Sequence, residues 1–327
     1  MGDKNEEGLT VLLEQNVQEE VQENEGEEDS SSEEESDGDG SNFPLVGAPG
    51  QYSYDDRMKL TEEERGWALA VKRAVAEEGD LEPLSDFWYC QFGIIDRDNV
   101  ERSLDRIRTM QAFREEYDFV DSWEAGMEFV RELISVMPGY WLALNYNPRD
   151  GNYIFAMDVA RFYAKILQAQ PELVRIWLLA SHFVTHAQCP DFKAIRKGSI
   201  LLMENEGFNF KANFGFSDMK RVYSEVAAVY PFKFDQIKNF NTGVLFNIIL
   251  SMTRGIASKE HSQKLQRGCR TADGVERLDE FFLSSGIQVA NEKLIQAIKA
   301  SLQWRFYCQS KFSLEEDNGA RQFVEER

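Results

Sequence analysis

Few side chains in this sequence are spaced for metal binding or nucleophilic chemistry, and the best-spaced pair is His182 and His186. Two histidines four residues apart on a helix lie on one face, which is a common spacing for metal ligands. The segment lacks the glutamate of an H-E-x-x-H motif, and the sequence indicates no third ligand. We therefore expect no metal site. The alternative interpretation, two polar residues on a partly buried helix, is favoured.

The motifs that mark common enzyme classes are also absent. The sequence contains no G-x-S-x-G nucleophile elbow, no phosphate-binding G-x-x-x-x-G-K-[ST] loop, and no G-x-G-x-x-G after a predicted strand. We expect neither a cofactor nor catalysis. An enzyme would need an arrangement of another kind, around Glu204, Glu206 or His182.

Cysteine spacing and hydropathy both favour a cytoplasmic protein. The four cysteines lie 99, 80 and 39 residues apart, which is not typical of a disulfide framework. No run of about 18 apolar residues occurs that would span a membrane. The first residues also lack the cationic and apolar regions of a signal peptide. The cysteines are Cys90, Cys189, Cys269 and Cys308.

Negative charge is concentrated at the start of the chain. The net charge is -21, and the first 41 residues hold 16 acidic residues and one lysine, a net -15. The other 286 residues carry 41 acidic and 35 basic residues, a net -6. This balance lacks the basic footprint of a nucleic-acid-binding protein, so no nucleic-acid partner is expected. Like-charge repulsion predicts a disordered acidic tail over residues 1–50.

The tail has the pattern of a substrate for an acid-directed kinase. Four of its serines are followed three residues later by an acidic residue, and they are Ser30, Ser31, Ser32 and Ser36. Phosphorylation would add negative charge, and we expect the tail to oppose docking on an anionic membrane. A solvated, unmodified tail is the alternative.

Helical periodicity dominates residues 51–136. Thr61 and Glu64 form a capping-box pattern that predicts a helix start. Further helices are expected around 85–92, from about 97 through Phe113, and after Ser122, where Pro138-Gly139 ends the last one. The sequence therefore predicts a helical module after the tail.

From residue 137 the pattern changes to alternating strands and helices. Strands are expected at 140–144, 153–157, 198–204 and 234–240, with a turn at 148–151. Helices are expected at about 172–187, 217–229, 243–253 and 289–311. The apolar run at 198–204 is typical of a strand buried on both faces. This order predicts an α/β layer over 137–285, a C-terminal helix at 286–311 and a tail at 312–327.

Ordered segments within this layer carry a family resemblance. They are Gly198–Phe210, Tyr230–Asn241 and Val244–Met252, preceded by the helical stretches Phe92–Leu104 and Phe113–Tyr117. Together they resemble the CRAL-TRIO lipid-binding and transfer family, nearest the α-tocopherol transfer and retinaldehyde-binding branch. The resemblance covers roughly residues 60–270. It implies a helical N-terminal module, then an α/β/α layer with a mixed or parallel sheet, and a gate helix over an interior pocket.

The resemblance also implies which side chains line that pocket. Alternation along 199–203 places three side chains on one strand face, and the family turns that face toward the ligand. Phe234 and Ile237 continue the wall if a bulge lies between them, and the Ser181 hydroxyl is a candidate to orient the ligand. The implied contacts are Trp177, Ser181, Ser199, Leu201, Met203, Val222, Val226, Phe234, Ile237, Phe246, Ile249 and Met252. The same spacings suit ordinary core packing, which is the alternative for each residue.

The segment from Val244 to Met252 is apolar on nearly all sides, which a helix with one buried face does not require. We interpret it as a mobile lid, with Gly243 and Gly255 as hinges. A helix buried permanently on both sides is the alternative.

These features predict a carrier that takes up a hydrophobic small molecule or phospholipid and moves it between membranes, with transient docking on the membrane surface. Four basic residues are candidates for membrane or phosphoinositide contact: Lys233, Lys238, Arg254 and Lys264. Lys233 and Lys264 match positions where related transfer proteins carry phosphoinositide-contacting residues, whereas Asp235 and Glu260 stand at other such positions. Scattered, solvated lysines are the alternative.

A function of another class fits the same fold. In this alternative the chain is a non-catalytic protein-interaction module with a vestigial pocket, and its acidic tail and C-terminal helix contact the partner.

Overall fold

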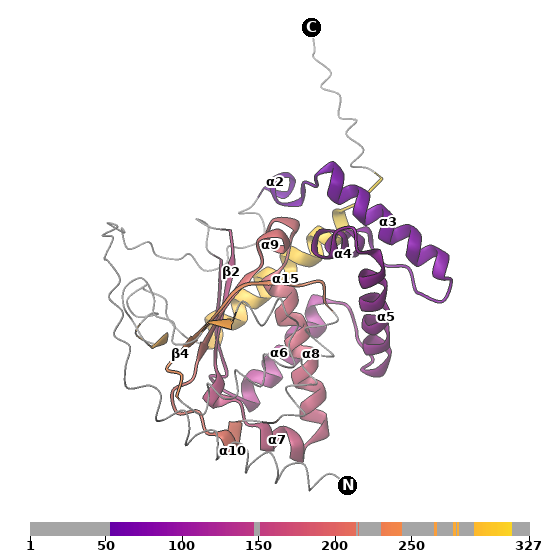
Figure 1. The fold of residues 1–327 in the computed structure, drawn as a ribbon. Coiled ribbons are helices and arrows are strands. Elements are labelled where there is room, and N and C mark those ends of the chain that lie inside the picture. Colours follow the sequence, from indigo (N-terminus) through magenta and orange to yellow (C-terminus); the bar gives the residue numbers. More distant parts are fainter. Residues whose placement is uncertain are drawn as a thin grey trace, which may run out of the picture.

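The computed structural model describes residues 53–146, 151–213, 215, 230–243, 265–266, 277–278, 280 and 291–315 (Figure 1). The acidic tail, the helix expected at 217–229, the apolar segment 244–252 and the end of the chain after 315 lie outside these residues.

Four helices open the described chain: α2 (Tyr54–Met58), α3 (Glu62–Glu78), α4 (Asp86–Asp96) and α5 (Val100–Glu116). The predicted capping box is confirmed. The Thr61 hydroxyl accepts from the Glu64 N–H at 3.2 Å, and the Glu64 carboxylate accepts from the Thr61 N–H at 2.9 Å. α5 begins three residues later than expected, because Arg97 takes a positive φ of 59° and Asn99 caps the helix.

Three longer and four shorter helical elements complete the described helices. α6 (Trp123–Val136) begins after the expected cap at Ser122, and α8 (Pro171–Gln188) and α15 (Asn291–Lys311) agree with the predicted helices to within two residues. Short helices missed by sequence periodicity are η1 (Val159–Arg161), α7 (Ala164–Ala169), α9 (Phe192–Lys197) and α10 (Phe210–Asn213). Six residues or fewer give less than two turns, which is too little for a period of 3.6 to be recognised.

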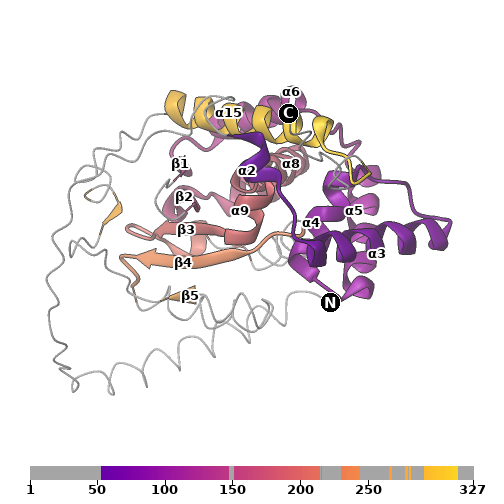
Figure 2. The same ribbon diagram turned by 90° about the horizontal axis from the view of Figure 1, so that it is seen from above.

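The sheet is mixed, and its strands follow chain order. They are β1 (Trp141–Tyr146), β2 (Tyr153–Asp158), β3 (Ser199–Glu204), β4 (Phe234–Phe240) and β5 (Leu265–Gln266). β1 and β2 are antiparallel, and each later strand lies parallel to the one before it. Figure 2 shows this order from above, with α6, α8 and α15 on one side of the sheet. The mixed α/β class is therefore confirmed.

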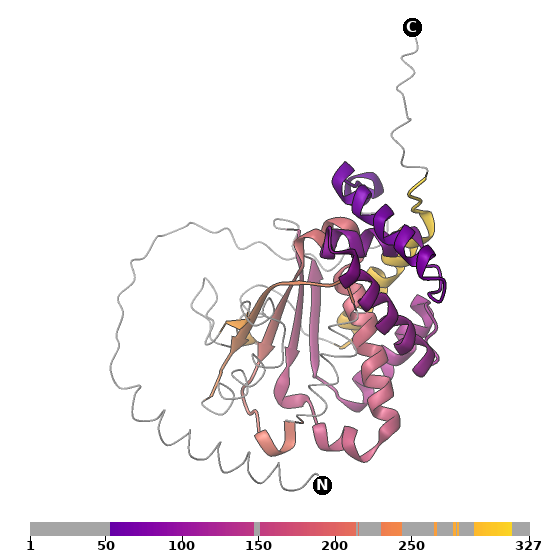
Figure 3. The ribbon, with the colours of Figure 1, turned by 45° about the vertical axis from the view of Figure 1, so that its right-hand side comes forward.

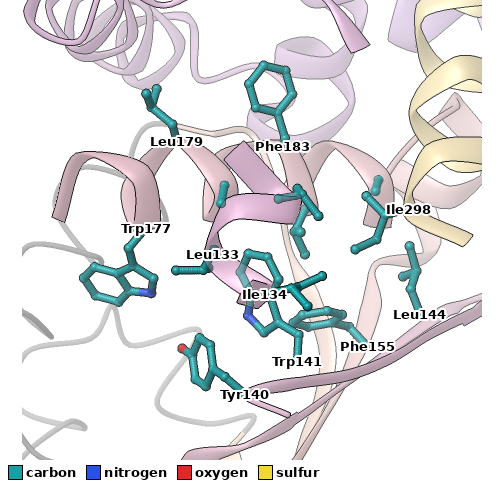
Figure 4. Packing of buried hydrophobic residues seen from close by; sticks show 14 of the residues in the cluster. Leu133, Ile134, Tyr140, Trp141, Leu144, Phe155, Trp177, Leu179, Phe183 and Ile298 are labelled. Carbon is teal, nitrogen blue, oxygen red and sulfur yellow. The ribbon is translucent and has the colours of Figure 1, made fainter. Parts of the chain in front are cut away.

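Two large hydrophobic cores hold these layers together. The sheet core joins α6, α8 and the first half of α15 to β1 and β2 (Figure 4). The module core joins α3, α4 and α5 to α9 and the second half of α15. The division expected at residue 136 does not coincide with the boundary between cores, because α6 packs against α8 and contributes Val130 and Leu133 to the sheet core.

The face of the sheet that points away from α6 and α8 carries a smaller hydrophobic cluster. Ile154, Ala156, Leu202 and Phe240 pack there with Leu278. The expectation that β3 is buried on both faces is wrong, because Ile200, Leu201 and Met203 are only half-buried. Figure 3 shows β3 and β4 farther from α8 along the sheet than β1 and β2. Helices in the described part of the chain therefore cover this half of the sheet incompletely.

Candidate functional site

The structure brings four predicted ligand-facing residues into one apolar surface, which we call the β3–β4 face. It consists of Val159, Leu201, Met203, Phe208, Phe234 and Ile237. Ile237 is buried, at 3 % exposure, and the other five are half-buried. The two large cores consist mainly of fully buried side chains, so this face differs from them among the described residues.

A bulge places β4 in this face. Phe234 pairs with Ser199, whereas Gln236 pairs with Ile200, so β4 has one extra residue at this point. Without it, Phe234 and Ile237 would point to opposite faces because side chains alternate along a strand. The bulge that the sequence required for both side chains to reach the face is therefore confirmed.

Ser199 has a different role from the one implied by the resemblance. Its side chain is buried, and its hydroxyl donates to the Oε1 of Gln188 on α8 at 2.6 Å. Its N–H donates to the Lys233 carbonyl at 3.1 Å. Both bonds tie the start of β3 to its neighbours, so Ser199 positions the strand rather than presenting a polar group on the β3–β4 face.

The two expected residues of α8 differ in their surroundings. Trp177 is 4 % exposed and belongs to the sheet core, where its ring centroid lies 5.1 Å from that of Phe162. Figure 4 shows it among the core side chains, so the alternative of ordinary core packing holds for Trp177. Ser181 is half-buried one turn further along the helix, and its carbonyl accepts from the Thr185 hydroxyl at 2.9 Å. Neither residue belongs to the β3–β4 face.

The other expected contacts lie outside the described residues. They are the pocket residues Val222, Val226, Phe246, Ile249 and Met252 and the basic residues Arg254 and Lys264.

The two described basic candidates do not form one patch. Lys238 pairs with Leu202, which packs on the opposite face of the sheet from Ile237. Lys233 lies at the start of β4 and lines a surface hollow of about 630 Å³ with Arg97 and Arg196. That hollow also contains Glu63, Glu64 and Asp98, and Arg196 is paired with Glu64 at 2.6 Å. Its charge is therefore mixed rather than uniformly basic.

A second hollow, of about 490 Å³, lies at the carboxyl ends of β2 and β3. Glu204 lines it, but its carboxylate already accepts four hydrogen bonds. The donors are the N–H groups of Asn205, Glu206 and Leu278 and the side-chain amide of Asn241. Glu206 is paired with Arg277 at 2.5 Å. These carboxylates join segments of the chain to one another.

Asp158 lies in the same hollow. Burial is the largest influence on its carboxyl and raises its pKa, an effect that the hydrogen bond from the Ala160 N–H and the charge of Arg161 oppose and the charge of Glu204 reinforces. His182, the third residue considered for an enzyme, lies elsewhere, between α8 and the helical module. The structure therefore does not bring the three residues Glu204, Glu206 and His182 into one site.

The histidine pair lies on the fully buried part of α8, a helix whose first residues are exposed. Both side chains have 0 % exposure, and burial lowers the pKa of both imidazoles well below the ordinary value. Aromatic rings surround them, including Trp88 of α4 and Tyr230 before β4. Among the described residues, no group of three or more His, Cys, Asp or Glu side chains could hold a metal ion.

The described cysteines offer no activated nucleophile. Cys90, Cys189 and Cys308 are buried and form no disulfide with one another. Burial raises the pKa of Cys189 to about 11 and also raises that of Cys308, so both remain thiols at neutral pH.

No family model matches the chain, and no curated protein matches it either. In the described part of the chain, no helix has both the length and the apolar character needed to cross a bilayer.

Proposed function

We propose that the chain binds a hydrophobic small molecule or lipid against the β3–β4 face and carries it between membranes. The observation that carries this proposal is the face itself, where one buried and five half-buried apolar side chains meet on β3, β4 and the segments that follow β2 and β3. Leu201 also packs on the sheet core, and Phe234 on the module core. The face thus lies on a rigid base, as small-molecule sites usually do.

The arrangement of elements supports a CRAL-TRIO-like fold. A helical module precedes a sheet with one antiparallel pair and parallel strands after it, and the long helix α15 follows the sheet. In this proposal the apolar segment 244–252 is the gate helix that covers the ligand.

Free energies favour transfer over simple capture. Burying a lipid chain gains about 0.8 kcal/mol for each methylene. A lipid that leaves a bilayer exchanges one apolar surrounding for another, so most of that gain cancels. Uptake is then set by access to the membrane surface, and Lys233 and the other basic candidates would assist docking on anionic lipid by about 1 kcal/mol each.

The decisive experiment measures lipid uptake from vesicles by mass spectrometry of the purified chain. Met203→Asp places a carboxylate on the β3–β4 face, and Ile200→Asp places one at a half-buried position of the same strand on the opposite face. We expect Met203→Asp to reduce uptake about tenfold or more, because a carboxylate loses hydration against an apolar ligand. The Ile200→Asp variant should take up as much lipid as the parent chain.

Two outcomes would contradict the proposal. One is the absence of stoichiometric lipid in the native chain after incubation with neutral and with anionic vesicles. The other is equal uptake by both variants. Phe246→Asp extends the test to the proposed gate, where unchanged uptake by a folded variant would remove the gate from the proposal while leaving the face.

The interaction-module alternative has less support among the described residues. It required the C-terminal helix as a contact surface, but α15 contributes Ile298 and Leu302 to the sheet core and Trp304 to the module core. Most of this helix is therefore committed to the fold. If the chain takes up no lipid, the interaction module becomes the favoured function.

A further inference from the structure

The aromatic rings around His182 join α8 to the helical module. Its imidazole stacks on Phe113 of α5, with ring centroids 4.6 Å apart, and meets the edge of Phe119 at 4.8 Å. On its other side lies Tyr230, the residue that leads into β4, at 3.8 Å. Three separate parts of the chain thus meet at one side chain.

His186, one turn along α8, continues this junction. Its ring lies 5.4 Å from Trp88 of α4 and 4.8 Å from Tyr230. Tyr230 and Trp88 are themselves 5.7 Å apart. We call His182, His186, Trp88, Phe113, Phe119 and Tyr230 the histidine junction.

Neither imidazole makes a conventional polar contact. The two nitrogens of each ring have no hydrogen-bond partner in the described part of the chain. Buried polar atoms are rarely left in this condition, because each forgoes the hydrogen bonds it has with water. The centroid separation of 3.8 Å between His182 and Tyr230 leaves no room for an atom bridging those two rings.

The charges facing the junction are cationic. The guanidinium groups of Arg114 on α5 and Arg305 on α15 act on both imidazoles. Arg114 also lies over Trp88 and pairs with Asp121 at 3.1 Å, while Arg305 is fully buried over Phe87 and Trp88. These cations oppose a bound metal ion and also oppose a proton on either histidine.

The neighbouring titratable groups do not offset this effect. Arg106 donates to the Tyr230 carbonyl at 3.3 Å and pairs with Asp96 at 3.4 Å. Cys189 and Cys308 near Arg305 are neutral thiols, because burial raises the pKa of each. No carboxylate contributes to the charges acting on the two imidazoles among the described residues.

We propose that the histidine junction is an acid-sensitive latch, which holds α8 to α4 and α5 when both rings are neutral and opens when they are protonated. Opening would also release Tyr230 at the start of the segment into β4. Through Phe232, whose ring lies 4.7 Å from that of Phe234, that segment reaches the β3–β4 face. The latch concerns the junction alone and does not depend on lipid binding.

The direction of the pH effect follows from the two states. In the closed state burial and the two guanidinium groups hold the pKa of each imidazole well below its ordinary value of about 6.5. In the open state the rings titrate near that ordinary value. Stability of the latch is therefore present above pH 6.5 and is lost as the pH falls below it. Between pH 7.5 and 5.5, each histidine favours the open state by about tenfold and both together by about a hundredfold.

The experiment measures hydrogen exchange in the full chain at pH 7.5 and 5.5, corrected for intrinsic exchange rates, in peptides covering α4, α5, α8 and residues 230–234. We expect the opening ratio of the parent chain to rise about a hundredfold on acidification. His182→Leu and His186→Leu should each retain about a tenfold rise, and the double variant almost none. The chain has three histidines, so His261→Leu is the matched control and should behave like the parent. Asp158→Asn is a second control, because burial raises the pKa of the Asp158 carboxyl. This variant should also behave like the parent.

Histidine NMR resonances of the parent chain give a test that needs no variant to fold. Two of the three imidazoles should stay in the neutral form at every pH at which the chain remains closed. The proposal is overturned if both buried rings titrate near pH 6.5 in the closed chain. It is also overturned if parent exchange is the same at both pH values, or if the double variant keeps the full pH response.

Discussion

At the scale of single residues, Gly198 shows how closely β3 and β4 approach. Its φ is +80°, in the left-handed region, and a Cβ added there would lie 2.9 Å from the Lys233 carbonyl oxygen. That same carbonyl accepts the Ser199 N–H. A side chain at 198 would therefore disturb the hydrogen bond that begins the parallel pair on which the β3–β4 face is built.

Comparing Gly198→Ala with Gly139→Ala separates the cost of backbone strain from the cost of a steric clash with the neighbouring strand. Gly139 has the same φ of +80°, but the nearest atom to an added Cβ is a flexible one of Arg161 at 3.8 Å. We expect Gly139→Ala to cost about 1 kcal/mol from backbone strain and Gly198→Ala about 1–3 kcal/mol more from the backbone contact. Urea unfolding of both variants measures the difference. Equal losses would show that strand approach plays no part.

Residue-scale predictions from the sequence succeeded where the partners are close in the chain. The capping box of Thr61 and Glu64 spans three residues and was fully predictable. Glu204 could not be understood in this way, because Leu278 donates to it from 74 residues away. Such hydrogen bonds depend on the final fold, and the sequence carries no local signal for them.

At the scale of elements, Asp191 fastens three helices. One carboxylate oxygen accepts from the Ala194 N–H at 3.0 Å and so caps α9. The other accepts from Arg57 of α2 at 2.5 Å and from the Trp304 indole of α15 at 2.9 Å. The side chains of both Arg57 and Asp191 are almost fully buried, at 4 % and 0 % exposure. A lone buried charge is costly, so the pair must act as a unit.

Asp191→Asn should therefore destabilise the chain far more than the loss of an ordinary cap. We expect a loss of about 3–5 kcal/mol, because Arg57 would remain buried without its carboxylate. Ser122→Ala, which removes the cap of α6 alone, should cost about 1 kcal/mol. Thermal or urea unfolding compares the two. A loss near 1 kcal/mol for both would mean that Asp191 serves only as a cap.

Helices were predictable in proportion to their length, whereas strands of six or seven residues were predictable from their shorter period. The expected helix at 172–187 corresponds to α8, whose 18 residues give a clear period, and β4 agrees with the strand expected at 234–240. α9 was missed, although Asp191 caps it, because its six residues hold only a short apolar pattern. The half-burial of β3 was mistaken for burial on both faces, since an apolar strand sequence is the same in either setting.

At the scale of the whole molecule, α15 connects the two cores. Leu294, Ile298 and Leu302 pack in the sheet core, and Trp304 and Cys308 pack in the module core. In between, the Ser301 hydroxyl donates to the Ala187 carbonyl at 2.6 Å, and Arg305 donates to the Cys189 carbonyl at 2.8 Å. Both acceptors lie at the C-terminal end of α8, so α15 bonds to this end of α8 between its contacts with the two cores.

This connection predicts that the helical module and the sheet unfold in one transition. Ile298→Ala removes a fully buried side chain from the sheet core and should lower stability by about 2–4 kcal/mol. Because α15 links the cores, hydrogen-exchange protection should fall equally in α4 and in β1, although α4 lies in the other core. Val120→Ala, at a side chain that is 60 % exposed, should change stability by about 0.5 kcal/mol or less. Loss of protection in β1 with α4 unchanged would show instead that the two cores fold separately and that α15 only spans them.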